Sequence, residues 1–131
     1  MRIGFVNEST QMHEIGNDVL PASELYDCSR FQQDLRLLQE HADYIYICSS
    51  HYGLIGLETP ISTYDTSSSM ARDTNFFLPN RLMSIFRSCL GGYEDKITLV
   101  CLDNIEANVK SALREVGQID TRYEFQSLSR L

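Results

Sequence analysis

The chain has 131 residues, the length of one domain, of which 43% are apolar and 22% charged. These proportions exclude intrinsic disorder and collagen-like polymers. Asp and Glu outnumber Lys and Arg by 18 to 11, a net charge of -7, which disfavours non-specific binding to duplex DNA because that affinity comes mainly from basic side chains.

No apolar run is long enough to span a membrane, and the amino-terminal residues turn polar too early for a secretory signal. We therefore expect a soluble, cytoplasmic protein without a membrane partner. The cysteines form no metal-binding pattern, and the common nucleotide, hydrolase and metal motifs are absent, so we expect neither a metal nor a cofactor. Cys48, Cys89 and Cys101 lie in apolar patterns and are interpreted as small buried hydrophobic residues.

Predicted strands and helices alternate along the chain. Apolar runs of strand type occupy 2–6, 44–48 and 97–102, with a weaker alternating run at 123–126 that is typical of an edge strand, and apolar residues at helical spacing predict helices over 29–41, 82–90 and 103–117. This order predicts an α/β fold, one three-layer domain over 1–131 with a largely parallel central sheet.

Three local signals define the predicted helix ends. Ser29 followed by Gln32 resembles a capping box, and Asp103 followed by Glu106 predicts the start of the third helix. Gly117 predicts the end of that helix.

Two long connections, 7–28 and 49–75, follow the first two predicted strands. In open α/β sheets the ligand binds beyond the carboxyl ends of the strands, and loops of this length in a small domain are commonly functional or disordered. We therefore expect the functional residues in these connections.

Three segments of these connections resemble one known family. Pro21–Tyr26 reads PASELY, Cys48–Ile55 reads CSSHYGLI and Pro60–Asp65 reads PISTYD. They are similar to an uncharacterised bacterial and phage domain family that carries C-S-K-x-K, P-A-x-x-L-Y, S-A-K-Y-G-L and P-Y-D motifs. More distantly, the pattern resembles the YaaA peroxide-stress proteins and the uracil-DNA-glycosylase-like domain of archaeosine synthase. The resemblance covers about 1–70 and implies a glycosylase-like fold and a connection with nucleobases or nucleic-acid modification.

The chain departs from that family at every motif lysine. Asn7–Gln11 stands where the family has C-S-K-x-K, and His51 stands where it has the lysine of A-K-Y-G. A mechanism that needs a Schiff base or an ammonium group at these positions cannot be carried over.

The residues themselves place candidate chemistry at the strand ends. Ser49, Ser50 and His51 follow a buried strand, and Gly53 would let the backbone approach a ligand. His51 is the strongest candidate for general acid/base work, with Glu8, after the first strand, as its expected neighbour. The alternative is that His51 only hydrogen-bonds a loop.

Aromatic residues in the same segments offer flat surfaces for a base. Tyr26, Tyr52 and Tyr64 could stack on one, although each is also typical of a half-buried packing residue. Asp65 could orient a hydroxyl or amine of the ligand, or form a turn.

Two functional interpretations remain open. The first is a small enzyme that accepts a nucleobase, nucleoside or nucleotide and performs base or nucleoside transfer or hydrolysis. The second is a binding or regulatory protein, phage-encoded or bacterial, that keeps the scaffold without the lysine chemistry and serves a ligand or a protein partner.

Overall fold

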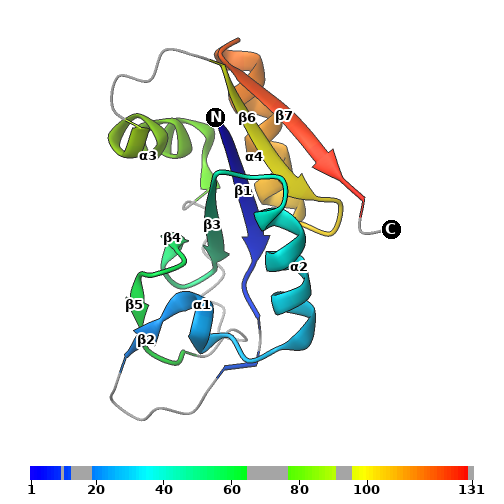
Figure 1. Cartoon of the computed structure of the whole chain (residues 1–131). Coiled ribbons are helices and arrows are strands. Elements are labelled where there is room, and N and C mark those ends of the chain that lie inside the picture. Colours follow the sequence, from blue (N-terminus) through cyan, green and yellow to red (C-terminus); the bar gives the residue numbers. More distant parts are fainter. Residues whose placement is uncertain (10, 13–18, 65–76, 91–95, 130–131) are drawn as a thin grey trace.

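The computed structural model describes residues 1–9, 11–12, 19–64, 77–90 and 96–129. Its elements follow one another, as Figure 1 shows, in the order β1 (Arg2–Asn7), β2 (Leu20–Pro21), α1 (Ala22–Leu25), α2 (Ser29–Gln39), β3 (Tyr44–Ser49), β4 (Gly53–Gly56), β5 (Pro60–Ile61), α3 (Pro79–Leu90), β6 (Ile97–Leu102), α4 (Ala107–Ile119) and β7 (Tyr123–Leu128).

The central sheet has five strands in the order β4-β3-β1-β6-β7. The pairs β1–β3, β1–β6 and β6–β7 are parallel, and β4 adds antiparallel to the outer side of β3. The sequence prediction of an α/β domain with a largely parallel sheet is confirmed, as are the three adjacent strands near 2–6, 44–48 and 97–102 and the position of β7 at an edge.

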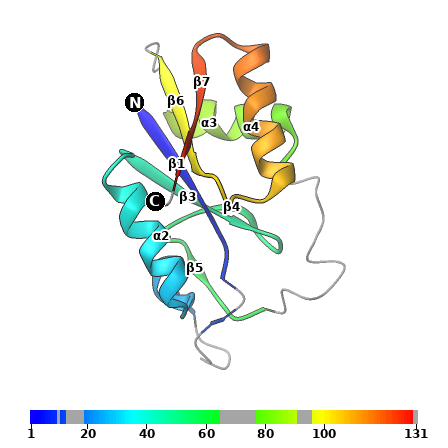
Figure 2. The same ribbon diagram turned by 90° about the vertical axis from the view of Figure 1, so that its right-hand side faces the viewer.

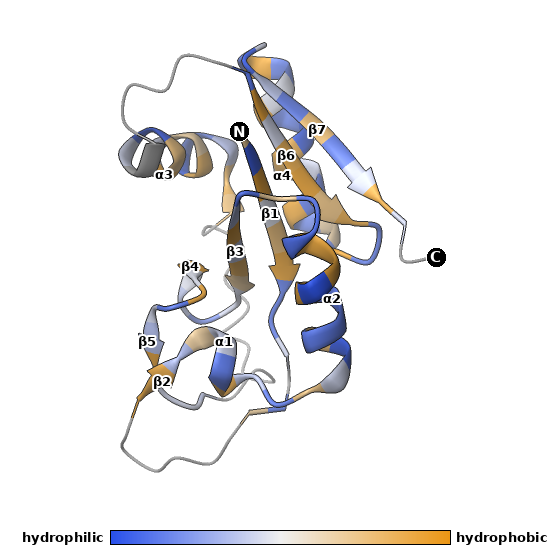
Figure 3. Ribbon diagram, in the orientation of Figure 1, coloured by the Kyte–Doolittle hydropathy of each residue, from blue (hydrophilic) through white to orange (hydrophobic). Residues whose placement is uncertain are grey.

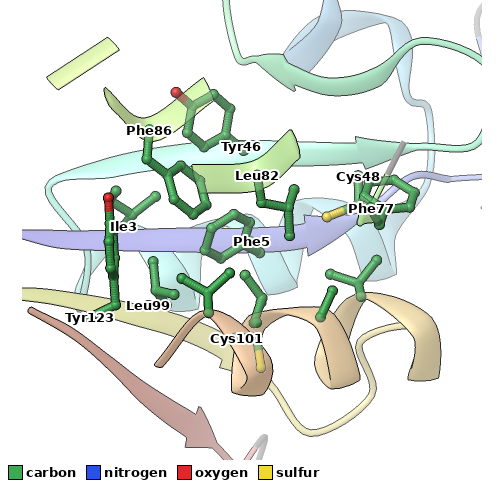
Figure 4. Close-up of a cluster of buried hydrophobic side chains, with 14 of the residues drawn as sticks. Ile3, Phe5, Tyr46, Cys48, Phe77, Leu82, Phe86, Leu99, Cys101 and Tyr123 are labelled. Carbon is green, nitrogen blue, oxygen red and sulfur yellow. The ribbon is translucent and has the colours of Figure 1, made fainter. Parts of the chain in front are cut away.

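Helices cover both faces of this sheet, and Figure 2 shows α2 and α4 on opposite sides of it. Side chains of successive strand residues point to opposite faces, so β1 contributes Ile3 and Phe5 to one apolar core and Val6 to the other. The first core packs against α3 and α4 (Figure 4), and the second packs against α1 and α2. Because β1, β3 and β6 are covered on both faces, they are apolar along almost their whole length (Figure 3).

The predicted helix ends were partly wrong. Ser29 is already helical, and Cys28 precedes the helix without a side-chain cap. The side-chain amide nitrogen of Gln32 donates to the carbonyl oxygen of Ser23 at 3.1 Å. This side chain therefore stabilises the α1–α2 connection and does not cap α2.

The third predicted helix also has different bounds. It begins at Ala107, and Glu106 precedes it without a side-chain cap. Gly117 lies inside α4, where a Cβ atom would meet the carbonyl oxygen of Tyr123 at 3.3 Å. This glycine therefore allows close packing of α4 on β7 and does not end the helix.

The two long connections contain short elements that the sequence pattern did not predict. β2 and β5 pair antiparallel in a two-stranded sheet, Leu20 opposite Ile61, and the backbone N–H of Ala22 donates to the carbonyl oxygen of Thr59 at 2.9 Å. An isolated bridge joins Met12 to Tyr26. As Figure 1 shows, β2, α1 and β5 lie beyond the carboxyl ends of β1 and β3.

Candidate functional site

The carboxyl ends of β1 and β3 bring Glu8 and Ser49 close together. The two strands are parallel, with Asn7 in register with Cys48. The backbone N–H of Glu8 donates to the carbonyl oxygen of Cys48 at 3.3 Å and continues the pairing by one residue. The strand geometry therefore delivers both side chains to one edge of the sheet.

The hydroxyl group of Tyr64 is the centre of a hydrogen-bond network at this edge. It donates a hydrogen bond to Oε1 of Glu8. It accepts from Oγ of Ser49 at 3.1 Å and lies 2.6 Å from the hydroxyl of Tyr26. A tyrosine hydroxyl has one proton, and since that proton goes to Glu8, Tyr26 must donate to Tyr64. We name these four residues the Tyr64 network.

Burial keeps both tyrosines of this network neutral. Removal from water raises the pKa of Tyr26 well above its ordinary value. The pKa of Tyr64 is raised too, first by burial and then by the neighbouring Tyr26 and the hydrogen bond to Glu8. Both hydroxyl groups therefore act as hydrogen-bond donors rather than as phenolates at neutral pH.

Ser49 also shapes the turn between β3 and β4. Its Oγ accepts the backbone N–H groups of His51 at 3.1 Å and of Tyr52 at 3.0 Å. Gly53 ends the turn with φ of 82°, a left-handed conformation that favours glycine. Oγ of Ser50 is buried and has no hydrogen-bond partner among the described residues, although such groups are normally satisfied.

Three aromatic rings meet beside the network. The ring of His51 stacks on that of Tyr64, with centroids 5.1 Å apart and planes inclined by 17°. The ring of Tyr52 is nearly perpendicular to both, at 4.6 Å from His51 and 5.3 Å from Tyr64. His51 and Tyr52 are both exposed. Two exposed rings therefore pack beside the partly buried Tyr64 network.

Asn7 links the carboxyl end of β1 to the connection between β6 and α4. Its amide nitrogen donates to the carbonyl oxygen of Asn104 at 2.8 Å, and its amide oxygen accepts the backbone N–H of Glu106 at 3.0 Å. In this strand order the connections of β1 and β6 leave on opposite faces, which makes their junction the usual ligand position. The Asn7 side chain ties the β6–α4 connection across this junction, and the predicted site residues lie instead at the ends of β1 and β3.

The structure brings together most of the predicted site residues. Glu8, Ser49, Tyr26 and Tyr64 form the network, and Ser50, His51, Tyr52 and Gly53 follow Ser49 directly. Asp65 lies outside the described residues. That these side chains bind a ligand or catalyse a reaction stays a prediction, as does the expectation that they line one concavity.

Glu8 and His51 are linked differently from the expected direct pair. Both contact Tyr64: Glu8 accepts a hydrogen bond from the Tyr64 hydroxyl, and the His51 ring stacks on the Tyr64 ring. Within the described part of the chain the imidazole of His51 makes no hydrogen bond. Sequence reasoning missed that Tyr64 would lie between them, and it also missed Asn7, whose side-chain partners lie near 104–106.

Two features are absent from the described residues. No group of three or more His, Cys, Asp and Glu residues is gathered there as a metal ion would require. None of the helices in those ranges has the length and apolarity to cross a bilayer.

Comparison with known proteins places the chain in a family. The model of DUF6884, a family of unknown function, matches residues 13–102, and the chain belongs to that family. This agrees with the expected resemblance to an uncharacterised domain. No curated protein and no solved structure matches the chain.

Proposed function

We propose that this member of the DUF6884 family binds a nucleobase, nucleoside or nucleotide at the carboxyl ends of β1 and β3. The observation that carries the proposal is the exposed ring of His51, stacked at 5.1 Å on Tyr64 with Tyr52 perpendicular beside it. A flat heterocycle would extend this stack on the outer face of His51. Stacking of a base on an aromatic side chain contributes about 1–3 kcal/mol.

The network behind the stack supports the same ligand class. Single bases are held by stacking combined with hydrogen bonds to their edges, and Glu8 supplies a carboxylate near the stacked rings. The unpartnered buried Oγ of Ser50 adds a polar atom at the same turn. The net charge of -7 favours a ligand of this size over a duplex.

A distant relationship to nucleic-acid-modification enzymes is part of the proposal. The parallel α/β sheet is compatible with a glycosylase-like fold of the YaaA and archaeosine-synthase type, and the site lies beyond the carboxyl ends of the strands, the side of such sheets on which ligands bind. The motif segments around Tyr26, His51 and Tyr64 support that relationship, because they all contribute to one cluster.

Binding without catalysis is the function that the geometry favours. A general base is normally oriented by a hydrogen bond from a third group, whereas the His51 imidazole has none within the described ranges. The motif lysines are also replaced. We also propose that such a binding subunit serves a protein partner.

A second candidate function rests on Glu8. Its charge-assisted hydrogen bond with Tyr64 holds the carboxylate in one orientation, as general base catalysis of nucleoside hydrolysis or transfer would need. In that case Glu8→Gln should reduce turnover about 10²–10⁴-fold.

Calorimetric titration of the purified protein with bases, nucleosides and nucleotides tests the proposal. We expect His51→Ala to weaken binding about 10-fold or more because the stacking surface is lost. His41→Ala is the matched control, since His41 is exposed in the turn between α2 and β3. If none of these compounds binds, or if both variants bind as the wild type does, the proposal is wrong.

A further inference from the structure

The strand β7 forms one edge of the central sheet. It is the last strand in the order β4-β3-β1-β6-β7, and within the described residues it pairs with β6 alone (Figure 1). It contains no lysine, proline or bulge, the features that proteins commonly use to keep an edge strand from pairing further. Its outer side can therefore accept another strand.

The pairing of β6 with β7 determines which backbone groups of β7 face outward. The backbone N–H of Asp103 donates to the carbonyl oxygen of Leu128, so the backbone of Leu128 faces β6. Because backbone groups of successive residues alternate between the two sides of a strand, Gln126 also faces β6. Phe125 and Ser127 have the opposite orientation, and their N–H and C=O groups point away from β6. In the described part of the chain these outward groups have no backbone partner.

A groove lies between β7 and α4. It has a volume of about 410 Å³, and Arg114, Gln118 and Phe125 are among the residues that line it. The guanidinium of Arg114 lies over the ring of Phe125, 5.3 Å from its centroid, which favours one position of the charge. Within the described residues this guanidinium has no ion-pair partner. Its N–H donors are therefore available to an anionic group beside β7.

Lys110 extends the positive charge along the same side of α4. It precedes Arg114 by one helical turn, so the two side chains lie on one face of the helix. Since α4 returns the chain from the end of β6 to the start of β7, Lys110 lies toward Ser127. Lys96, which also lines the groove, is already paired with Glu124 at 3.5 Å. A chain of net charge -7 thus presents local positive charge beside its edge strand.

We propose that β7 binds an extended acidic segment of a protein partner, which adds to the sheet as a further strand. Main-chain hydrogen bonds to Phe125 and Ser127 supply affinity, and alternate side chains supply specificity. Every second side chain of the added strand faces α4, so carboxylates at alternate positions reach Arg114 and Lys110. This edge is the opposite one from β4, and the proposal does not depend on nucleobase binding at the Tyr64 network.

A second copy of the chain fits this edge less well than an acidic segment. Two β7 strands paired about a twofold axis would bring the two α4 helices together on one face of the joined sheet. Arg114 and Lys110 of each copy would then face the same residues of the other, and like charges repel. An acidic segment is instead complementary in charge.

Fluorescence anisotropy with labelled peptides of about eight residues tests the proposal. We expect a peptide of alternating threonine and glutamate to bind, and a peptide of alternating threonine and lysine not to bind. Arg114→Gln should weaken binding of the acidic peptide about 10- to 100-fold, the range for hydrogen bonds to a charged group. Arg36→Gln, at an exposed arginine of α2, is the matched control and should bind as the wild type does.

A proline substitution tests the backbone pairing separately from the charge. Ser127→Pro removes an N–H that points away from β6, so the β6–β7 pairing is kept, and binding of the acidic peptide should weaken about 10-fold or more. Ser127→Ala keeps this N–H and should bind as the wild type does. Urea unfolding shows whether both variants are folded. In the wild type, the bound peptide should also slow hydrogen exchange of the Ser127 amide.

Several results would overturn the proposal. It is wrong if neither peptide binds, if the lysine peptide binds as tightly as the acidic one, or if exchange at Ser127 does not slow. It is also wrong if folded Ser127→Pro keeps the wild-type affinity, because charge alone then explains the binding. If the wild type sediments as a dimer that Ser127→Pro dissociates, the edge is an interface between copies instead. Nucleoside binding, measured by calorimetry, stands or falls independently of each result.

Discussion

Replacing Tyr64 by phenylalanine should destabilise the protein more than its partial exposure suggests. The ring and its stack with His51 remain, but the hydroxyl that joins three residues is lost. The side chains of Tyr26 and Ser49 are fully buried, at 0% exposure, so their hydroxyl groups would lose the acceptor that they share. A buried donor left unpaired costs about 1–3 kcal/mol, and Ser49 still accepts two N–H groups. We expect the free energy of unfolding to fall by about 2–4 kcal/mol in total.

Equilibrium unfolding in urea measures this change, and a second variant tests its cause. Tyr26→Phe combined with Tyr64→Phe removes the orphaned donor together with its former acceptor. The double variant should therefore be no less stable than Tyr64→Phe alone, a clear departure from additivity. Tyr44→Phe, at an exposed tyrosine of β3, is the control and should change stability by less than about 0.5 kcal/mol. A cost below that value for Tyr64→Phe, or strict additivity in the double variant, would refute the network as described.

Three further predictions concern other parts of the molecule. Gly53→Ala should cost about 1–2 kcal/mol in thermal or urea unfolding because the residue has a positive φ; an unchanged midpoint would contradict a left-handed turn. Asn7→Ala should cost about 1–3 kcal/mol in the same assay through loss of both hydrogen bonds of its amide, while nucleoside affinity should stay as in the wild type if the ligand lies between β1 and β3. In native protein, Cys28 should react with iodoacetamide before Cys48 and Cys101, as measured by peptide mass spectrometry. Backbone N–H groups lower the pKa of the Cys28 thiol, whereas burial raises the pKa of Cys48 and raises the pKa of Cys101 to about 11. Equal rates at all three sites would show that the core is not closed as described.

The central sheet was predictable because its strands carry strong local signals. Continuous apolar runs rich in β-branched residues, such as Ile97–Leu102, are typical of strands buried on both faces. Parallel pairing then places the residues after β1 and β3 at one edge, so the proximity of Glu8 and Ser49 followed from the pattern.

The short elements were not predictable, since tertiary contacts determine them. Leu20–Pro21 and Pro60–Ile61 form strands only because they pair with each other, although they are far apart in the sequence. The role of Tyr64 depends on that placement as well, because nothing in its sequence neighbourhood indicates that its hydroxyl meets Glu8. The prediction that Gly117 ends a helix was wrong for a similar reason. Gly117 is needed because β7 packs closely against α4 at this residue, and not because a helix ends there.

The small β2–β5 sheet has a consequence for the local dynamics of the protein. It ties the two long connections to each other, and the backbone N–H groups of Ala22 and Ser23 donate to Thr59 and Leu57 on the opposite segment. Neither connection can detach without breaking hydrogen bonds of the other, so the two should open as one cooperative unit. In native-state hydrogen exchange, their amides would share one opening free energy, lower than that of the central strands, and a bound ligand would slow exchange in both connections at once.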